Sequence, residues 1–331
     1  MNQACFHGYL VEKSADGAVR GDWRELAAGD LPPGDVVIKT VFSSLNYKDA
    51  LAAQGHPGVV RKLPHVPGID VAGTVFASTD PRFQVGQEVV VTGYELGSGQ
   101  WGGWAELVRV PADWIVPRPK GLSLFEMMIL GTAGFTAAQC VQAIQRCEIG
   151  PDAGEILVTG ATGGVGSLAV KLLAKLGYRV VASTGKESQH AALMEWGAAR
   201  IISREEVTSD SPKPMLGAKW AAAVDTVGGN TLATVIRETA PYGCVAACGL
   251  VAGAELPLTV HPFLLRGVTL AGIASALLPY SRRLDVWRLL AGEWRIDDLE
   301  RLSAIIRPQE LGGAVARISR GEMVGRTVLR I

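Results

Sequence analysis

Residues 158–177, "VTGATGGVGSLAVKLLAKLG", gather four glycines before a helical pattern and end on a fifth. The run before them, residues 155–159, is short and apolar, which is typical of a strand buried on both faces of a parallel sheet. Apolar residues then recur from Val165 to Leu176 at the spacing of a helix with one buried face. Gly177 stands where such a helix would end. The stretch therefore predicts a strand, a tight turn and a helix.

The glycines of this turn indicate a site for phosphate. Because glycine lacks a Cβ, the backbone can bring its N–H groups at the helix N-terminus close to an anion. The next apolar run, residues 178–183, completes a strand-helix-strand unit of the size that binds dinucleotides. A glycine-rich turn without a ligand is the alternative. The candidate cofactor-binding residues of the turn are Gly160, Ala161, Gly163, Gly164, Val165 and Gly166.

The end of the second strand indicates which dinucleotide is bound. Units that bind NAD usually place an acidic residue there for the adenosine ribose. This chain has Ser183, Thr184, Gly185 and Lys186 instead, and two hydroxyls and a cation favour a 2′-phosphate. We therefore expect NADPH as the cofactor, with Arg204 as a further candidate for the phosphate. A solvated loop lysine is the alternative for Lys186.

Composition excludes several functional classes. The 331 residues carry 32 acidic and 32 basic side chains, so no basic excess indicates nucleic acid or an anionic membrane as a partner. No apolar run approaches the ~18 residues that span a bilayer, and no signal peptide is evident at the N-terminus. An odd number of scattered cysteines favours reduced core thiols and a cytoplasmic protein. These are Cys5, Cys140, Cys147, Cys244 and Cys248.

The order of the patterns predicts an α/β protein with two folding units. Short β-type runs at 36–42, 71–76, 88–92 and 105–110 predict a small β-domain. Ser123 and Glu126 have the spacing of a capping box, and strands and helices then alternate to about residue 273, as in a doubly wound parallel sheet. We expect a β-domain over residues 1–125, a dinucleotide-binding domain over 126–273, and a return to the first domain over 274–331.

Motifs spread over nearly the whole chain form one set: "SSLNYKDAL" (43–51), "PGIDVAGTV" (67–75), "GTAGFTA" (131–137), "VTGATGGVG" (158–166), "DTVGG" (225–229) and "GRTVL" (325–329). This set resembles the medium-chain dehydrogenase/reductase superfamily. Together with "GCVAACGL" (243–250) and "PFLLRGVTLAGI" (262–273), it is similar to the acrylyl-CoA reductase branch of the quinone oxidoreductase-like members. The resemblance implies a GroES-like catalytic domain and a Rossmann domain that binds NADPH.

Two departures from the zinc enzymes of this superfamily predict that no metal is bound. Zinc alcohol dehydrogenases have a cysteine ligand near the position of Asn46, and Gly-His-Glu where this chain has Gly68-Ile69-Asp70. Isoleucine cannot bind a metal, and no Cys/His cluster replaces the three ligands that a catalytic zinc needs. Chemistry without zinc suits a substrate that is already electrophilic. A C=C bond conjugated to a thioester or a ketone fits, and the resemblance implies a short enoyl thioester, with the reduction of acrylyl-CoA to propionyl-CoA.

The resemblance also implies which residues form the site. Tyr47 is the candidate proton donor or hydrogen-bond partner of the enolate, and Asn46 would orient cofactor or substrate; a filler of the domain interface is the alternative for Tyr47. We expect Lys48 and Asp49 to form a structural pair. Further cofactor contacts are expected from the two threonines of "GTAGFTA", although helix packing is the alternative for them. Residues at the ends of parallel strands are also expected to contact the cofactor. These residues are Thr132, Thr136, Cys248, Gly249, Leu250 and Ile273.

Phosphates of coenzyme A would need cations. Arg61, Lys62, Arg282 and Arg283 are available, although solvated surface charges are the alternative, and the resemblance favours Arg326, which we also expect near the cofactor. An NADPH:quinone reductase and a non-catalytic NADPH-binding structural or sensor protein stay open as other functions. Residues 263–275 predict a helix turn and an apolar strand at a sheet edge, so we expect a homodimer through that edge.

Overall fold

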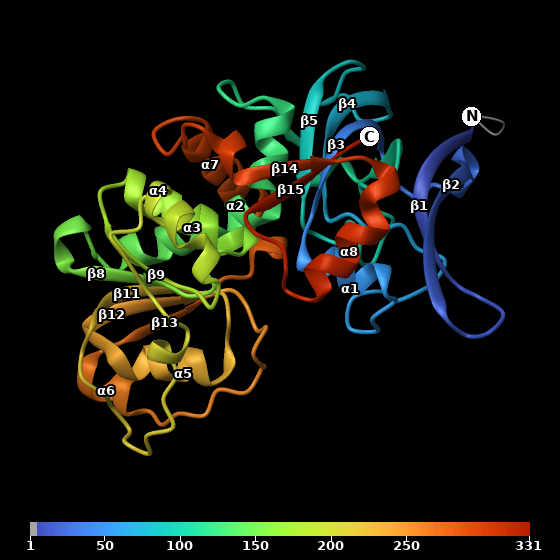
Figure 1. Ribbon diagram of the computed structural model, residues 1–331. Coiled ribbons are helices and arrows are strands. Elements are labelled where there is room, and N and C mark those ends of the chain that lie inside the picture. Colours follow the sequence, from blue (N-terminus) through green and yellow to red (C-terminus); the bar gives the residue numbers. More distant parts are fainter. Residues whose placement is uncertain (1–4) are drawn as a thin grey trace. The chain divides into compact units, whose positions relative to one another are not determined.

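The computed structural model describes residues 5–331, and the chain divides into two compact units. Unit 1 comprises the chain up to Thr132, Ala276–Gly292 and Asp297–Ile331. Unit 2 comprises Ala133–Ser275 and the short piece Glu293–Ile296. In Figure 1 the blue N-terminal and red C-terminal strands both belong to unit 1. The limits expected from the sequence, residues 125 and 273, stay a prediction.

Unit 1 is built on a seven-stranded sheet with the order β14-β15-β3-β4-β5-β7, and β6 pairs with β3. The strands are β3 (Val36–Leu45), β4 (Asp70–Ser78), β5 (Glu88–Thr92), β6 (Leu107–Val110), β7 (Val116–Pro117), β14 (Ser303–Ile306) and β15 (Arg326–Arg330). A separate hairpin joins β1 (Cys5–Lys13) to β2 (Val19–Ala27), and helices α1 (Tyr47–Ala53), α7 (Tyr280–Ala291) and α8 (Leu311–Ser319) complete the unit. Pairing of β15 with β3 brings the C-terminal segment into this sheet.

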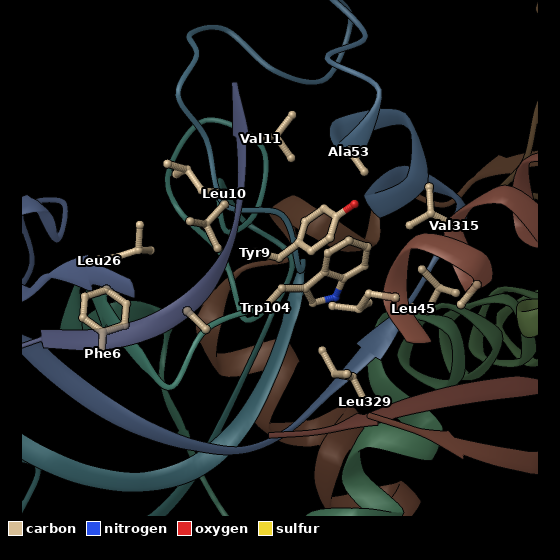
Figure 2. Packing of buried hydrophobic residues seen from close by; sticks show 14 of the residues in the cluster. Phe6, Tyr9, Leu10, Val11, Leu26, Leu45, Ala53, Trp104, Val315 and Leu329 are labelled. Atoms are coloured by element: carbon tan, nitrogen blue, oxygen red, sulfur yellow. The ribbon is translucent and has the colours of Figure 1, made fainter. Parts of the chain in front are cut away.

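A tryptophan lies at the centre of one core of unit 1 (Figure 2). Trp104 is fully buried, and its ring meets the edge of Tyr9 with centroids 5.6 Å apart. Its indole Nε1 donates a hydrogen bond to the carbonyl of Ser44 at 3.1 Å, which satisfies the ring's polar atom. Leu45 and Leu329 pack into the same cluster. This contact ties the end of β3 to the loop that carries Trp104.

Unit 2 is a doubly wound parallel sheet with the strand order β10-β9-β8-β11-β12-β13. Its strands are β8 (Glu155–Val158), β9 (Arg179–Ser183), β10 (Arg200–Ile202), β11 (Trp220–Asp225), β12 (Thr239–Ala247) and β13 (Thr269–Gly272), and all of their pairings are parallel. The helices that follow them are α3 (Gly164–Lys175), α4 (His190–Glu195), α5 (Gly229–Glu238) and α6 (His261–Arg266). This order confirms the predicted fold class and places β13 at an edge.

Helix α2 (Leu124–Arg146) carries the chain from unit 1 into unit 2. The predicted capping box starts it: Ser123 N–H donates to the Glu126 carboxylate at 2.8 Å, and Glu126 N–H donates to Ser123 Oγ at 3.2 Å. The helix is broken at Gly131, whose φ of 49° and ψ of −154° are not helical. It is long and apolar enough to cross a membrane, contrary to the sequence-based expectation, but 83% of its most apolar window is buried inside the protein, as in a core helix.

All five cysteines are free thiols, but the expectation of five core thiols is wrong in part. Cys140 and Cys244 are buried, Cys147 and Cys248 are partly exposed, and Cys5 is exposed. Cys5 lies at the start of β1, a strand of the N-terminal hairpin that no sequence pattern had indicated.

Candidate active site

The turn between β8 and α3 can be formed only with glycine at two positions. Gly160 has a φ of +58°, and a Cβ there would lie 2.4 Å from Thr226 Oγ1. A Cβ on Gly166 would lie 2.3 Å from the carbonyl oxygen of Gly160, so the third glycine allows close packing of helix and turn. Gly163 caps the N-terminus of α3 in an extended conformation. The bare turn and the helix N-terminus therefore fit a dinucleotide pyrophosphate.

A buried set of side chains holds this turn to the neighbouring strand. Thr159 Oγ1 donates to the Asp225 carboxylate at 2.7 Å, and Thr226 N–H donates back to Thr159 Oγ1 at 3.0 Å. Asp225 also accepts from Gly228 N–H at 2.8 Å. Burial raises the pKa of Asp225, while these hydrogen bonds act in the opposite direction. The carboxylate thus links the ends of β8 and β11, a role that no local sequence pattern indicates.

Four candidate phosphate contacts lie at the ends of β9 and β10. Ser183 and Thr184 are buried: Ser183 Oγ donates to the carbonyl of Ser203 at 3.3 Å, and Thr184 Oγ1 accepts from Lys186 N–H at 3.1 Å. The two hydroxyls therefore shape the loop. Arg204 packs across Gly185, its side chain is exposed, and Glu205 pairs with it at 3.1 Å. Lys186 and Arg204 are thus the two cations at this position.

The other expected cofactor contacts of unit 2 lie along β12, β13 and α2. Cys248 N–H donates to the carbonyl of Asp225 at 2.9 Å, and Ile273 N–H donates to the carbonyl of Ala247 at 3.0 Å. A Cβ on Gly249 would lie 2.0 Å from the carbonyl oxygen of Thr226, so this strand end must approach β11 closely. Leu250 beyond it is 67% exposed. Thr136 is buried, and its hydroxyl bonds to Ser275 Oγ at 2.8 Å.

In unit 1 the polar candidates converge on one buried carboxylate, that of Asp70 in β4. Asp70 is 0% exposed and accepts hydrogen bonds from Ser44 Oγ at 2.5 Å and from Thr132 Oγ1 at 2.6 Å. Thr132 N–H donates to both carboxylate oxygens at 3.0 Å. Gly131 is needed beside it, because a Cβ there would lie 2.6 Å from Asp70 Oδ2. Thr132, expected at the cofactor, has its hydroxyl engaged inside unit 1.

The amide of Asn46 is fixed in the same cluster. Its Nδ2 donates to Asp70 Oδ2 at 2.9 Å and to Asp49 Oδ2 at 3.0 Å, and its Oδ1 accepts from Arg326 Nη1 at 3.2 Å. Both amide hydrogens and the carbonyl oxygen therefore have charged partners. Asn46 positions the backbone at the start of α1, and its amide has no donor left for a substrate.

Asp49 bonds to backbone N–H groups, so the expected pairing with Lys48 is wrong. Its carboxylate accepts from Asn46 N–H at 2.8 Å, from Gly68 N–H at 3.1 Å and from Ile69 N–H at 2.7 Å. Lys48 is only partly buried, whereas Asp49 is fully buried. Burial, followed by the charge of Asp70, raises the pKa of Asp49 to about 7, against the lowering effect of its N–H donors.

Tyr47 is the accessible member of the predicted pair. It is the first residue of α1, directly after Asn46, and it is 47% exposed. Because Asn46 and Asp49 are fixed on both sides of it, the start of α1 is rigid. The structure thus offers a phenol hydroxyl on a rigid element, which suits a group that donates a hydrogen bond or a proton.

Two arginines that were candidates for holding phosphates of coenzyme A are buried. Arg326 is 2% exposed, and its Nε donates to the carbonyl of Ile129 at 2.7 Å. Arg283 is 0% exposed, donates to the carbonyl of Thr92 at 2.7 Å and stacks on the ring of Tyr94. Their positions do not support a role in holding phosphates of coenzyme A. Arg61, Lys62 and Arg282 are exposed, and Arg61 pairs with Glu95 at 3.2 Å.

The donors at the position of the zinc ligands do not fit a metal. Ile69 is buried and has no donor atom, and Asn46 is engaged in the cluster described above. Among residues 5–331, no group of three or more His, Cys, Asp or Glu side chains could hold a metal ion. The cluster of Asn46, Asp49, Asp70 and Arg326 lies there instead.

The raised pKa of Asp49 predicts a pH-dependent stability. Because its native pKa of about 7 exceeds the ordinary 3.8, the native state binds more protons than the unfolded state between these values. The free energy of unfolding should therefore fall by up to ~4 kcal/mol as the pH rises from about 4 to about 7. Urea denaturation across this range should show that the free energy of unfolding depends less on pH in Asp49→Asn than in the wild type. The control Asp30→Asn, at an exposed position, should leave this pH dependence unchanged. Equal slopes for Asp49→Asn and wild type would contradict the assignment.

Comparison with known proteins identifies the family. Residues 32–120 match the model of the alcohol dehydrogenase GroES-like domain, and residues 164–291 match that of zinc-binding dehydrogenases. The chain is 45% identical over 322 residues to the probable acrylyl-CoA reductase AcuI of Escherichia coli, covering 97% of this chain and 99% of that protein. It is 43% identical to the putative quinone oxidoreductase YhfP of Bacillus subtilis, over 98% of this chain and 99% of that protein.

Solved structures agree with these matches. The yhdH oxidoreductase of Salmonella enterica in complex with NADP is 46% identical, with a TM-score of 0.95 over 98% of this chain and 99% of that one. The Bacillus subtilis protein yhfP with NAD bound is 42% identical, with a TM-score of 0.96 over 99% of this chain and 100% of that one. The chain therefore belongs to the quinone oxidoreductase-like branch of the medium-chain dehydrogenase/reductase superfamily that contains the acrylyl-CoA reductases.

Proposed function

We propose that this protein is a zinc-independent, NADPH-dependent reductase of a short enoyl thioester, which converts acrylyl-CoA to propionyl-CoA. The observation that carries the proposal is the exposed phenol of Tyr47 on a helix start fixed by Asn46 and Asp49. The 45% identity to the probable acrylyl-CoA reductase AcuI supports the substrate. The glycine turn of unit 2 supports a dinucleotide cofactor.

The residues that would hold NADPH all come from unit 2. Gly160, Gly163 and Gly166 leave room for the pyrophosphate at the N-terminus of α3. Lys186 and Arg204 would bind the 2′-phosphate, since no acidic residue stands at the end of β9. Bound NADPH supplies a hydride to the β-carbon of the conjugated C=C bond.

Tyr47 would stabilise the enolate that forms after hydride transfer and would supply its proton. Negative charge develops on the thioester carbonyl oxygen when the C=C bond is reduced, and a hydroxyl donor stabilises such an oxygen. The α-carbon then needs a proton, which the phenol can donate. Asn46, Asp49 and Asp70 act through position: their hydrogen bonds hold the first turn of α1, so Tyr47 needs no rearrangement before it donates.

An NADPH:quinone reductase is the second candidate, because the chain is 43% identical to the putative quinone oxidoreductase YhfP. A quinone takes protons from water after reduction and has no requirement for Tyr47. A non-catalytic NADPH-binding protein is the third possibility, and steady turnover of any enoyl-CoA excludes it.

Replacement of Tyr47 tests the reaction. Tyr47→Phe should lower kcat on acrylyl-CoA by roughly 10²-fold, because one acid–base group is lost, and should leave NADPH affinity unchanged. NADPH oxidation at 340 nm with acrylyl-CoA, crotonyl-CoA and quinones measures both substrate classes, and quinone reduction should respond much less. Wild-type turnover of quinones with none of acrylyl-CoA would refute the thioester assignment. Full thioester activity of Tyr47→Phe would refute the role of the phenol.

Reversal of one charge tests the cofactor. Lys186→Asp should weaken NADPH binding by about 1.5 to 3 kcal/mol, as expected when a hydrogen bond to a charged group is lost, and NADH binding should change little. Fluorescence titration with both nucleotides gives the ratio. Lys175→Asp, at the far end of α3, is the control with no expected effect on that ratio. An unchanged preference for NADPH would move the assignment to Arg204.

We also propose that the protein is a cytoplasmic homodimer that pairs through the β13 edge. Its five free thiols support a reducing compartment. The helix α6, which precedes β13 in the chain and packs against β12, exposes Leu264 by 76% and Leu265 by 65%, and Tyr242 in β12 is 80% exposed. An exposed apolar patch at a sheet edge is typical of a protein interface.

The dimer can be tested by adding charge to the patch. Leu264→Glu together with Leu265→Glu should convert the dimer to a monomer at micromolar concentration, because the interface would have to bury two carboxylates. Analytical ultracentrifugation measures the mass. Val85→Glu, at a position 73% exposed in unit 1, should leave the dimer intact. A monomeric wild type would contradict the proposal.

A further inference from the structure

A hollow of about 360 Å³ lies in unit 1 between α7 and the segment around the end of β7. Its volume falls in the range of sites that hold small molecules. Residues from 116 to 120 line one side and residues from 284 to 292 line the other. None of them belongs to the cluster around Asp70 or to the glycine turn of unit 2. The hollow is therefore separate from the residues that serve the proposed reaction.

One face of α7 forms the first wall of this hollow. Its lining residues are Leu284, Trp287, Arg288 and Ala291. Positions three, four and seven residues after the first share one face of a helix, so these side chains lie together. Trp287 is buried, whereas Leu284 is 38% exposed. The wall is thus apolar at depth and reaches solvent at Leu284.

The opposite wall is apolar and rigid. It is formed by Val116, Pro117 and Pro119, and a proline ring fixes the backbone φ and leaves no N–H to donate. Just beyond, Gly121 has a φ of +101°, and a Cβ there would lie 2.6 Å from the carbonyl oxygen of Ala291. The chain therefore passes close to the end of α7. Because both walls are fixed, the hollow is formed before any ligand enters.

The charged side chains that line the hollow are both cationic. They are Lys120 and Arg288, and both are exposed. Lys120 forms no ion pair with any of residues 5–331. Arg288 pairs with Asp285 at 2.9 Å, but 77% and 55% of these two side chains are exposed, and such surface pairs are weak. An apolar hollow with a positive rim is complementary to an anion that carries an apolar body.

We propose that this hollow binds a monocarboxylate whose apolar chain has about six to eight carbons, since its volume is at the lower end of the range for ligand sites. The chain lies against Leu284, Trp287 and the prolines, and the carboxylate meets Lys120 and Arg288. A neutral chain leaves the two cations without a partner, and a small anion leaves the apolar walls without one. Only a ligand with both parts satisfies the whole lining.

Isothermal titration calorimetry of the full-length protein tests the ligand chemistry without turnover. Octanoate should bind at one site per chain. Hexanoate should bind roughly tenfold more weakly, because two fewer CH₂ groups are buried. Octan-1-ol, which keeps the chain and lacks the charge, and acetate, which keeps the charge and lacks the chain, should both bind more weakly than octanoate. No saturable binding of millimolar octanoate, or equal binding of octan-1-ol, would overturn the proposal.

Replacement of the two cations tests the place of the carboxylate. Lys120→Gln combined with Arg288→Gln should weaken octanoate binding by roughly tenfold, because two exposed charge contacts are lost. Arg282→Gln is the matched control: it removes a cation of the same helix that lies off the lining face, and octanoate affinity should stay unchanged. The same octanoate affinity in the double variant and in the wild type would overturn the proposal.

Hydrogen exchange of the wild-type protein locates the ligand without any substitution. Saturating octanoate should slow amide exchange in residues 280–292, because a ligand that binds the folded state stabilises the element it contacts. The peptide that contains Gly121 should be protected as well, whereas the hairpin of β1 and β2 should exchange as before. Protection confined to other segments, such as the start of α1 at Tyr47, would place octanoate elsewhere and overturn the proposal.

Discussion

The buried carboxylate of Asp70 is the constraint on which the catalytic unit depends. A carboxylate without exposure costs several kcal/mol unless it is fully hydrogen-bonded. Its donors come from Ser44 at the end of β3, Asn46 before α1 and Thr132 in α2, so these segments must meet around one point. The guanidinium of Arg326 in β15 supplies positive charge to the same cluster. The carboxylate also requires glycine at the kink of α2, because a Cβ on residue 131 would lie 2.6 Å from Asp70 Oδ2.

Much of unit 2 could be predicted from the sequence because its signals are local. The strand at 155–159, the helix after it and Gly177 appear within a residue or two of their predicted positions, since a buried parallel strand and an amphipathic helix each leave a continuous pattern. The second strand of the N-terminal hairpin, β2, left no such pattern. The strand Val19–Ala27 is mostly exposed and carries charges on both faces, so neither alternation nor an apolar run marks it.

The polar residues of the site were harder to predict because their partners are distant in the chain. Asn46 and Arg326 are 280 positions apart, and Asp49 and Ile69 are 20 apart. Lys48 and Asp49 are neighbours in sequence, yet successive residues of a helix point in different directions, and only Asp49 turns inward. The burial of Arg283 was hard to predict for the same reason. Its charge is accommodated in the interior because its guanidinium donates to the carbonyl of Thr92 and stacks on the ring of Tyr94, both far away in the sequence.

The cluster around Asp70 also limits which substrates the protein can reduce. It provides rigidity at the start of α1, where its two carboxylates and its guanidinium are each bonded to the amide of Asn46. Among residues 5–331, its donor set does not fit a metal that would polarise a carbonyl. In the proposed reaction, activation then comes from the substrate itself and from a hydrogen bond that Tyr47 would donate. A C=C bond conjugated to a thioester delivers the developing charge to an oxygen, where one donor can stabilise it. An isolated alkene places that charge on carbon, beyond the reach of any hydroxyl, and would not react.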